Sequence, residues 1–117
     1  MLSFTGHRIF LVPGPTDMRK SYDGLSGVVR DRLGADPQSR DLFVFCNRGR
    51  NRLKVLLYDE SGAWVLAKRL DRGTFAWPGE SSAGTSIEYD EHRLMLLLRG
   101  FDAEHITPRR WSRRRAG

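Results

Sequence analysis

Cysteine is nearly absent from this chain of 117 residues, since Cys46 is its single representative. One cysteine excludes both an internal disulfide and a cysteine-based zinc site. Long apolar runs are missing as well. No stretch approaches the roughly 18 uninterrupted apolar residues of a membrane span, and the first residues lack the apolar centre of a signal peptide. We therefore expect a cytoplasmic protein without a membrane partner, in which Cys46 is an unreactive core residue.

The residue sets that are typical of catalytic sites are also missing. The three histidines are scattered, and no nucleophile, base and orienting group follow a recognisable pattern. A remote alternative is a small metal-dependent nuclease in which Asp17, Asp59 and Asp90 hold the metal. Asp17 and Asp90 are better explained as helix caps, and Asp59 as a turn residue. We therefore expect a non-enzymatic protein with no cofactor and no metal site.

Short apolar runs separated by turn residues predict the strands. The first is "RIFLV", residues 8–12, which is followed by the turn signal "PGP". Three further runs, "LFVFCN", "RLKVLLYD" and "AWVLAKRL", are joined by short polar loops and predict an antiparallel meander. The segment "SIEYD" predicts a last, short strand.

Two helices complete the expected fold. An apolar stripe predicts the first helix, with Thr16 or Asp17 as its cap and Gly34 as its end. The segment "EHRLMLLLRG" predicts the second, capped by Asp90. We expect a single α+β domain over residues 1–102, with a mostly antiparallel sheet of about four to five strands and two helices packed on one face. Residues 103–117 are expected to form a basic, disordered tail.

Arginine supplies the basic character of the chain. It accounts for 17 of the 20 basic residues, which exceed the 14 acidic residues by six. The last nine residues, "RRWSRRRAG", contain five arginines and no acid, so the remainder has 15 basic and 14 acidic residues and is close to neutral. Guanidinium suits phosphates and stacked bases, but a GC-rich genome would give the same composition. The positions of the arginines are therefore more informative than their number.

The segment "CNRGRNRLK", residues 46–54, places Arg48, Arg50, Arg52 and Lys54 at every second position without an intervening acid. It lies between two apolar runs, which predict strands joined by a hairpin. We expect Arg48 and Arg50 to lie in the hairpin loop. Arg52 and Lys54 are expected to begin the second strand.

Strand alternation assigns the neighbouring side chains to faces of the sheet, if Tyr58 pairs with Ala63 across the next hairpin. The core face would contain Leu53, Val55, Leu57, Trp64 and Leu66, and the outer face Arg52, Lys54, Leu56, Tyr58, Val65 and Arg69. Like charges that face each other destabilise a sheet, so this outer face needs an explanation. It is solvated surface, or a platform where cations contact phosphates and Tyr58 stacks on a base, or a docking face for an acidic protein.

A second basic site is expected where "VPGPTDMRK" leads from a strand into a helix. Backbone N–H groups at a helix start can hold an anion, and Arg19 and Lys20 lie in the first turn. Asp17 would repel a phosphate, however, and would serve well as a cap. The segment lacks the Walker pattern, so a capped turn is the competing interpretation.

Taken together, these motifs resemble a known family. The segments "GPTDMRKSYDGL", "LFVFCNRGRNRLKVLLYD", "KRL" and "GTFAWP" are similar to those of a small accessory protein of IS66-type bacterial insertion sequences, the product of the second reading frame, often called TnpB. The likeness runs from about residue 8 to 102. It implies a mobile-element protein that is encoded beside a separate transposase and needed for efficient transposition, with no established catalytic mechanism. The RNA-guided nucleases that share the short name are much longer and carry motifs that are missing here.

The leading hypothesis is a non-catalytic accessory factor of DNA transposition that binds nucleic acid through the basic hairpin. The expected contact residues are Arg48, Arg50, Arg52, Lys54, Arg69, Arg19 and Lys20, with Tyr58 available for stacking. The expected partners are DNA, with RNA as an alternative, and the transposase of the same element, while the oligomeric state stays open. The competing hypothesis is a protein adaptor whose basic patch docks on the transposase or on a host factor.

Overall fold

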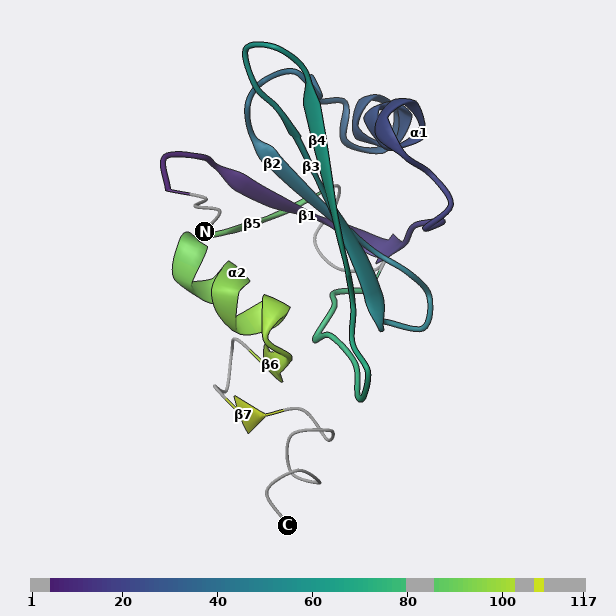
Figure 1. Cartoon of the computed structure of the whole chain (residues 1–117), viewed down its shortest axis with the longest axis vertical. Helices are drawn as coiled ribbons and strands as arrows, with labels where there is room; N and C mark the ends of the chain where they lie inside the picture. Colours follow the sequence, from purple (N-terminus) through teal and green to yellow (C-terminus); the bar gives the residue numbers. More distant parts are fainter. Residues whose placement is uncertain (1–4, 80–85, 103–106, 109–117) are drawn as a thin grey trace.

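Five strands form the central sheet of the computed structural model, which describes residues 5–79, 86–102 and 107–108 (Figure 1). They are β1 (Ile9–Pro15), β2 (Leu42–Cys46), β3 (Arg52–Tyr58), β4 (Ala63–Arg69) and β5 (Ile87–Tyr89). Their order across the sheet is β4-β3-β2-β1-β5. Only β1 and β2 are parallel, and the other neighbouring pairs are antiparallel. The predicted α+β class with a mostly antiparallel sheet is confirmed.

The first strand continues past its predicted end at residue 12. The register between β1 and β2 shifts between Leu11 and Pro15, and Gly14 has a φ of +78° that suits glycine. Proline has no N–H group for a regular ladder, and it is tolerated at such an irregularity. The Gly14 N–H group donates instead to the Pro78 carbonyl at 3.0 Å. The strand therefore carries the chain beyond "PGP" to the end of the sheet.

A helical segment connects β1 to β2. It consists of α1 (Tyr22–Val28) and a π-helical turn, η1 (Val29–Leu33). Gly34 ends it with a φ of +62°, as predicted. The predicted cap at Thr16 or Asp17 is wrong, because the helix begins only after Ser21 and the Asp17 carboxylate accepts the Arg19 N–H group in a local turn.

The second helix, α2 (Glu91–Leu98), begins at its predicted cap. The Asp90 carboxylate accepts a hydrogen bond from the Arg93 N–H group at 2.8 Å. Two short strands, β6 (Phe101–Asp102) and β7 (Thr107–Pro108), follow and pair with each other. The described residues of the predicted tail are 107–108, whereas residues 103–106 and 109–117 lie outside the described residues, so the predicted boundary at residue 102 stays a prediction.

The two helices lie on opposite faces of the sheet, so the prediction that both pack on one face is wrong (Figure 1). Leu94 and Leu97 of α2 belong to a core on one face. Leu25 of α1 and Val29 of η1 belong to a separate core on the other. The reason lies in β2, whose side chains point alternately to both faces and are all buried.

The face of β3 that was expected to be the outer one is also covered. The predicted pairing of Tyr58 with Ala63 is confirmed, and Leu53, Val55 and Leu57 do lie in the core on the α2 side. Leu56 is buried in the core on the α1 side, where Tyr58 and Val65 pack against it. This face therefore becomes open only toward the end of the sheet that carries Arg52 and Arg69.

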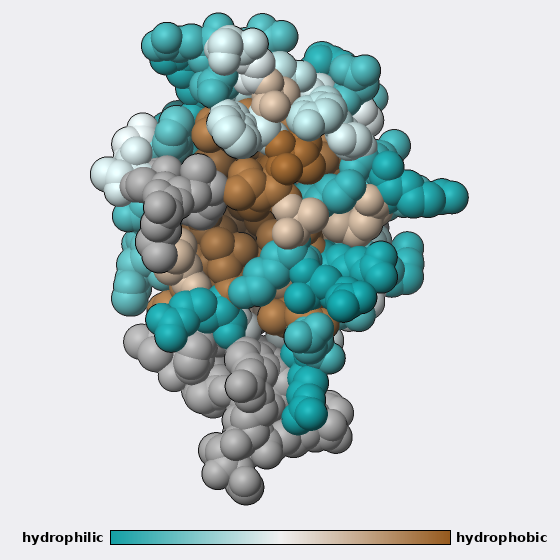
Figure 2. All heavy atoms as spheres, in the orientation of Figure 1, coloured by the Kyte–Doolittle hydropathy of each residue, from teal (hydrophilic) through white to brown (hydrophobic). Residues whose placement is uncertain are grey.

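Apolar side chains gather over the middle of the face that is shown in Figure 2, with hydrophilic residues around them. Cys46 belongs to the core on the α2 side and is completely buried. Burial raises the pKa of its thiol to about 12, so the thiol stays protonated at neutral pH. None of the described helices is both long enough and apolar enough to cross a membrane.

The double-sided core predicts that each helix is needed for stability. Leu25→Ala on the α1 side and Leu97→Ala on the α2 side each remove a fully buried side chain. Each should lower the free energy of unfolding by about 2–5 kcal/mol, as measured by urea denaturation. Met95→Ala is the matched control, since Met95 lies on α2 but is 40% exposed, and it should have a much smaller effect. A negligible effect of either leucine substitution would contradict the two-sided core.

Candidate functional site

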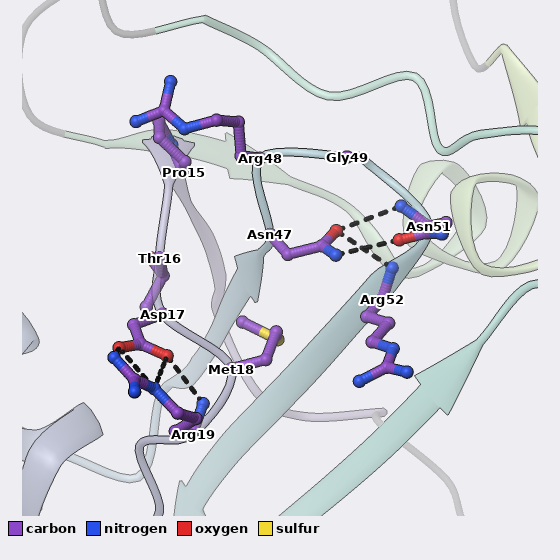
Figure 3. A pocket seen from close by; sticks show the side chains of 10 residues that line it. All are labelled: Pro15, Thr16, Asp17, Met18, Arg19, Asn47, Arg48, Gly49, Asn51 and Arg52. Atoms are coloured by element: carbon purple, nitrogen blue, oxygen red, sulfur yellow. Dashed lines mark hydrogen bonds and ion pairs between the residues drawn. The ribbon is translucent and has the colours of Figure 1, made fainter.

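A closed loop of residues 47–51 joins β2 to β3. The side-chain oxygen of Asn47 accepts hydrogen bonds from the N–H groups of Asn51 and Arg52, each at 3.0 Å (Figure 3). Its amide nitrogen donates to the side-chain oxygen of Asn51 at 2.8 Å. Backbone and side-chain groups of Asn47 thus hold both ends of the loop, which fixes the position of the arginines on it.

Backbone hydrogen bonds hold this hairpin against its neighbours on two sides. On one side, the Thr16 N–H group donates to the Cys46 carbonyl at 2.7 Å. On the other, the Phe75 N–H group donates to the Arg50 carbonyl at 2.6 Å and the Leu70 N–H group donates to Asn51 at 2.8 Å. The hairpin therefore lies flush with the ends of β1 and β4 and does not project from the sheet.

The flush hairpin presents three exposed arginines. Arg48, Arg50 and Arg52 have exposed side chains, and within the described residues no ion pair involves any of them. Arg52 lies directly opposite Arg69 on β4, and Arg69 is also exposed, 3.7 Å from an oxygen of Asp71. The predicted concentration of like charge at this position is therefore present, and it disfavours the folded sheet.

Arg50 also has an unusual backbone conformation. Its φ of +59° lies in the left-handed region, which costs a residue other than glycine roughly 1–2 kcal/mol. The N–H group of Arg50 donates to the Asn47 carbonyl at 3.1 Å, which closes the turn. Glycine would make the same backbone contacts without the steric cost, so the fold does not require an arginine side chain here.

A hollow of about 710 Å³ separates the hairpin from the segment that follows β1. Its lining residues are Pro15, Thr16, Asp17, Met18, Arg19, Asn47, Arg48, Gly49, Asn51 and Arg52. In Figure 3 the side chains of Arg48 and Arg52 extend from the hairpin in different directions, while that of Arg19 turns to Asp17. The Thr16 hydroxyl is buried without a hydrogen-bond partner. Two free guanidinium groups and one paired guanidinium group therefore surround this hollow.

Asp17 and Arg19 neutralise each other on the side of the hollow formed by the segment that follows β1. The Arg19 guanidinium contacts both carboxylate oxygens, with a shortest distance of 2.7 Å. Hydrogen bonds from the side chain and then the backbone of Arg19 lower the pKa of Asp17 to about 2. The carboxylate is therefore ionised at neutral pH, and Arg19 is not a free cation as the sequence suggested.

The other predicted contact residues are less available. The Lys54 ammonium group donates to the Lys20 carbonyl at 2.7 Å, which ties β3 to the chain before α1. Tyr58 packs against the core under α1, and its hydroxyl lies 3.0 Å from that of Ser26. Tyr58 also lies at the far end of β3 from Arg52, roughly 20 Å away. The structure therefore does not bring Tyr58 together with the arginines.

Arg72 is a cation at this end of the sheet that the sequence analysis missed. It is exposed, and it lies in the chain between Leu70 and Phe75, both of which are bonded to the hairpin. About twenty residues separate Arg72 from Arg52, so their proximity is not evident from the sequence alone. The predicted pairing of β3 with β4 places Arg69 beside Arg52, and Arg72 follows Arg69 by three residues, so this pairing could have indicated Arg72.

The three carboxylates of the nuclease alternative have separate structural partners. Asp17 holds Arg19 and Asp90 caps α2. Asp59 closes the β3–β4 turn, where hydrogen bonds from Trp64 at 2.7 Å and from the turn backbone lower its pKa to about 2. Among residues 5–79, 86–102 and 107–108, no group of three histidine, cysteine, aspartate or glutamate side chains could hold a metal ion.

Known proteins are similar to this chain over most of its length. A family model described as "IS66 Orf2 like protein" matches residues 7–108. Among curated relatives in Sinorhizobium fredii (strain NBRC 101917 / NGR234), the uncharacterized protein y4hO is 39% identical over 98 residues, which is 84% of each chain. The uncharacterized protein y4jC is 33% identical over 97 residues, or 83% of this chain and 81% of the relative. No solved structure matches the chain significantly.

The pairing of Asp17 with Arg19 predicts a measurable titration. The folded pKa of Asp17 lies below the ordinary value of 3.8, so the stabilisation from the pair is present above about pH 4 and is lost as the pH falls toward 2. Arg19→Gln should raise the pKa of Asp17 toward 3.8 in an NMR titration of the carboxyl carbons. Asp59 is the internal control, because its partners do not change and its pKa should stay low in the variant. An unaltered Asp17 midpoint would show that the guanidinium is not the cause.

Proposed function

This chain belongs to the IS66 Orf2-like family, and on that premise we propose that it is a non-catalytic accessory factor of transposition that binds nucleic acid through its basic hairpin. The observation that carries the proposal is the set of three exposed arginines, Arg48, Arg50 and Arg52, without an ion-pair partner among the described residues. Their side chains extend from a fixed loop and from the first residue of β3, at one end of the sheet, and Arg69 extends the same basic surface.

The electrostatics of this surface favour a polyanion. Guanidinium groups bind phosphate oxygens through parallel hydrogen bonds, and phosphate contacts position nucleic acids without reading their sequence. Within the part of the chain that the structure describes, Asp17 is the one carboxylate that lines the hollow beside the hairpin, and Arg19 neutralises it. The Lys54 ammonium group and the Arg19 guanidinium are already engaged with other groups of the chain. Lys20 contributes only its carbonyl to these contacts, and its side chain is exposed. We assign all three residues a supporting role.

An acidic protein surface is the second candidate ligand of the same arginines. Carboxylates accept the same bidentate hydrogen bonds from guanidinium as phosphates do, and the transposase of the element is the expected partner. In this alternative the chain is an adaptor, and the basic hairpin joins it to the transposase or to a host factor without contact to nucleic acid.

The salt dependence of binding tests the proposal. Binding of the full chain to a DNA fragment from the end of an insertion sequence of this type, as a duplex and as separated strands, should weaken steeply as salt rises. The double variant Arg48→Gln, Arg52→Gln should reduce the slope of log K against log salt by about 1.4–1.8, because two phosphate contacts are lost. Fluorescence anisotropy at several salt concentrations measures this slope.

A charge-matched control removes two arginines elsewhere. Arg30 on η1 is exposed, and Arg40 lies before β2, at the opposite end of the sheet, 3.8 Å from Glu60. Arg30→Gln with Arg40→Gln should leave the slope unchanged. Equal slopes for both double variants, or no DNA binding at low salt, would refute the proposal. Retention of the transposase from nuclease-treated lysate in the absence of DNA binding would establish the adaptor instead.

A further inference from the structure

Three hollows follow one another around the end of the sheet. The hollow of about 710 Å³ between the hairpin and the end of β1 is the first. A second, of about 370 Å³, lies beside Pro15, Arg48, Arg50 and Trp77, and a third, of about 330 Å³, lies between Arg52 and Arg69. Arg48 lines both the first and the second hollow, and Arg52 lines both the first and the third. The hollows are therefore neighbours, joined through these two arginines.

No described element at this end is shaped to enter a groove of duplex DNA. The major groove admits an α-helix or a projecting two-stranded ribbon. Neither α1 nor α2 contributes a residue to the three hollows. The β2–β3 hairpin does not project, because its backbone is bonded to Thr16 on one side and to Phe75 on the other. A stiff duplex would touch only the outermost side chains of this surface, whereas a flexible single strand can follow its hollows.

The charged residues that line the hollows are almost all basic. Among the described residues that line them, Asp17 is the one carboxylate, and it is held by Arg19. Lys68 lines the third hollow and donates to the Leu98 carbonyl at 2.6 Å. Arg48, Arg50 and Arg52 remain, spread over all three hollows in one continuous series. A positively charged groove of this kind is the electrostatic element of sites for single strands.

We propose that the three hollows form one track for a single-stranded polynucleotide, whose phosphates lie successively on Arg52, Arg48 and Arg50. The track rests on the proposed function and specifies its ligand as an extended single strand. Arg50 is central to this inference, because its left-handed backbone favours glycine while its side chain lines the second hollow. The Arg50 guanidinium, which the fold does not use, then contacts the strand.

Three polynucleotides of one base sequence test whether the ligand is a single strand or a duplex. The full chain is titrated against a labelled single DNA strand, the same strand as RNA, and the blunt duplex. We expect at least one single strand to bind about tenfold more tightly than the duplex, a difference of about 1.4 kcal/mol. Whether the DNA strand or the RNA strand binds more tightly identifies which of the two is the ligand. A duplex that binds as tightly as both strands would overturn the track but leave the proposed function intact. Absence of binding to all three would overturn both.

Arg50→Gly tests the proposed contact against a matched control. The substitution relieves the left-handed strain, so it should raise the midpoint of thermal unfolding while reducing the salt slope for the single strand by about 0.7. Arg40→Gly removes the same charge at a φ of +69°, at the opposite end of the sheet, and should raise the midpoint without changing the slope. Opposite effects on stability and binding cannot come from unfolding. Equal slopes for Arg50→Gly and the unmodified chain would overturn the assignment of Arg50 to the track.

Discussion

All five side chains of β2 are withdrawn from solvent, and this double-sided burial is the constraint on which the other elements depend. A strand that is buried on both faces needs a packed layer above and below it. The crossover through α1 and η1 supplies one layer, and α2 supplies much of the other. β2 can then lie only in the middle of the sheet, with β1 and β3 as its neighbours. The polar residues of the hairpin begin directly after Cys46, where the buried strand ends.

The chain that emerges from β2 is fixed at once. Asn47 closes the loop through its side chain, and backbone hydrogen bonds to the segments at Thr16 and Phe75 hold it from both sides. Little conformational freedom of the loop backbone is left to lose on binding, so the backbone that carries Arg48 and Arg50 is preorganised. The same bonds place the hairpin level with the neighbouring strands, so that its residues line the shallow hollows at this end of the sheet. Burial of β2 and presentation of the arginines are thus consequences of one arrangement.

Local patterns in the sequence predicted most helices and strands correctly. The main errors concern features that depend on contacts between distant parts of the chain. A tight turn and period-two alternation were enough to pair Tyr58 with Ala63, and the cap at Asp90 was evident from the residues beside it. The choice of face for each helix depends on the crossover between parallel strands, which no short segment encodes. For the same reason the predicted open position of Tyr58 is wrong, because α1 covers it. The arginines of the hairpin were found because their position depends on the adjacent turn alone, whereas the ion pair between Asp17 and Arg19 depends on where the helix begins.

The energetics of the hairpin are consistent with the proposed role of its arginines, because the arrangement is unfavourable for the folded chain alone. Arg50 accepts a backbone conformation that costs roughly 1–2 kcal/mol, and Arg52 faces Arg69 across two strands, which costs up to about 1 kcal/mol more. No ion pair to Arg48, Arg50 or Arg52 within the described residues offsets these terms. Glycine at position 50 and an acidic residue at position 52 would both favour folding. Because the body of the chain is close to neutral, a general excess of cations in the sequence does not explain the cluster. The proposed polyanion would remove the repulsion and would contact the side chain of the strained residue Arg50.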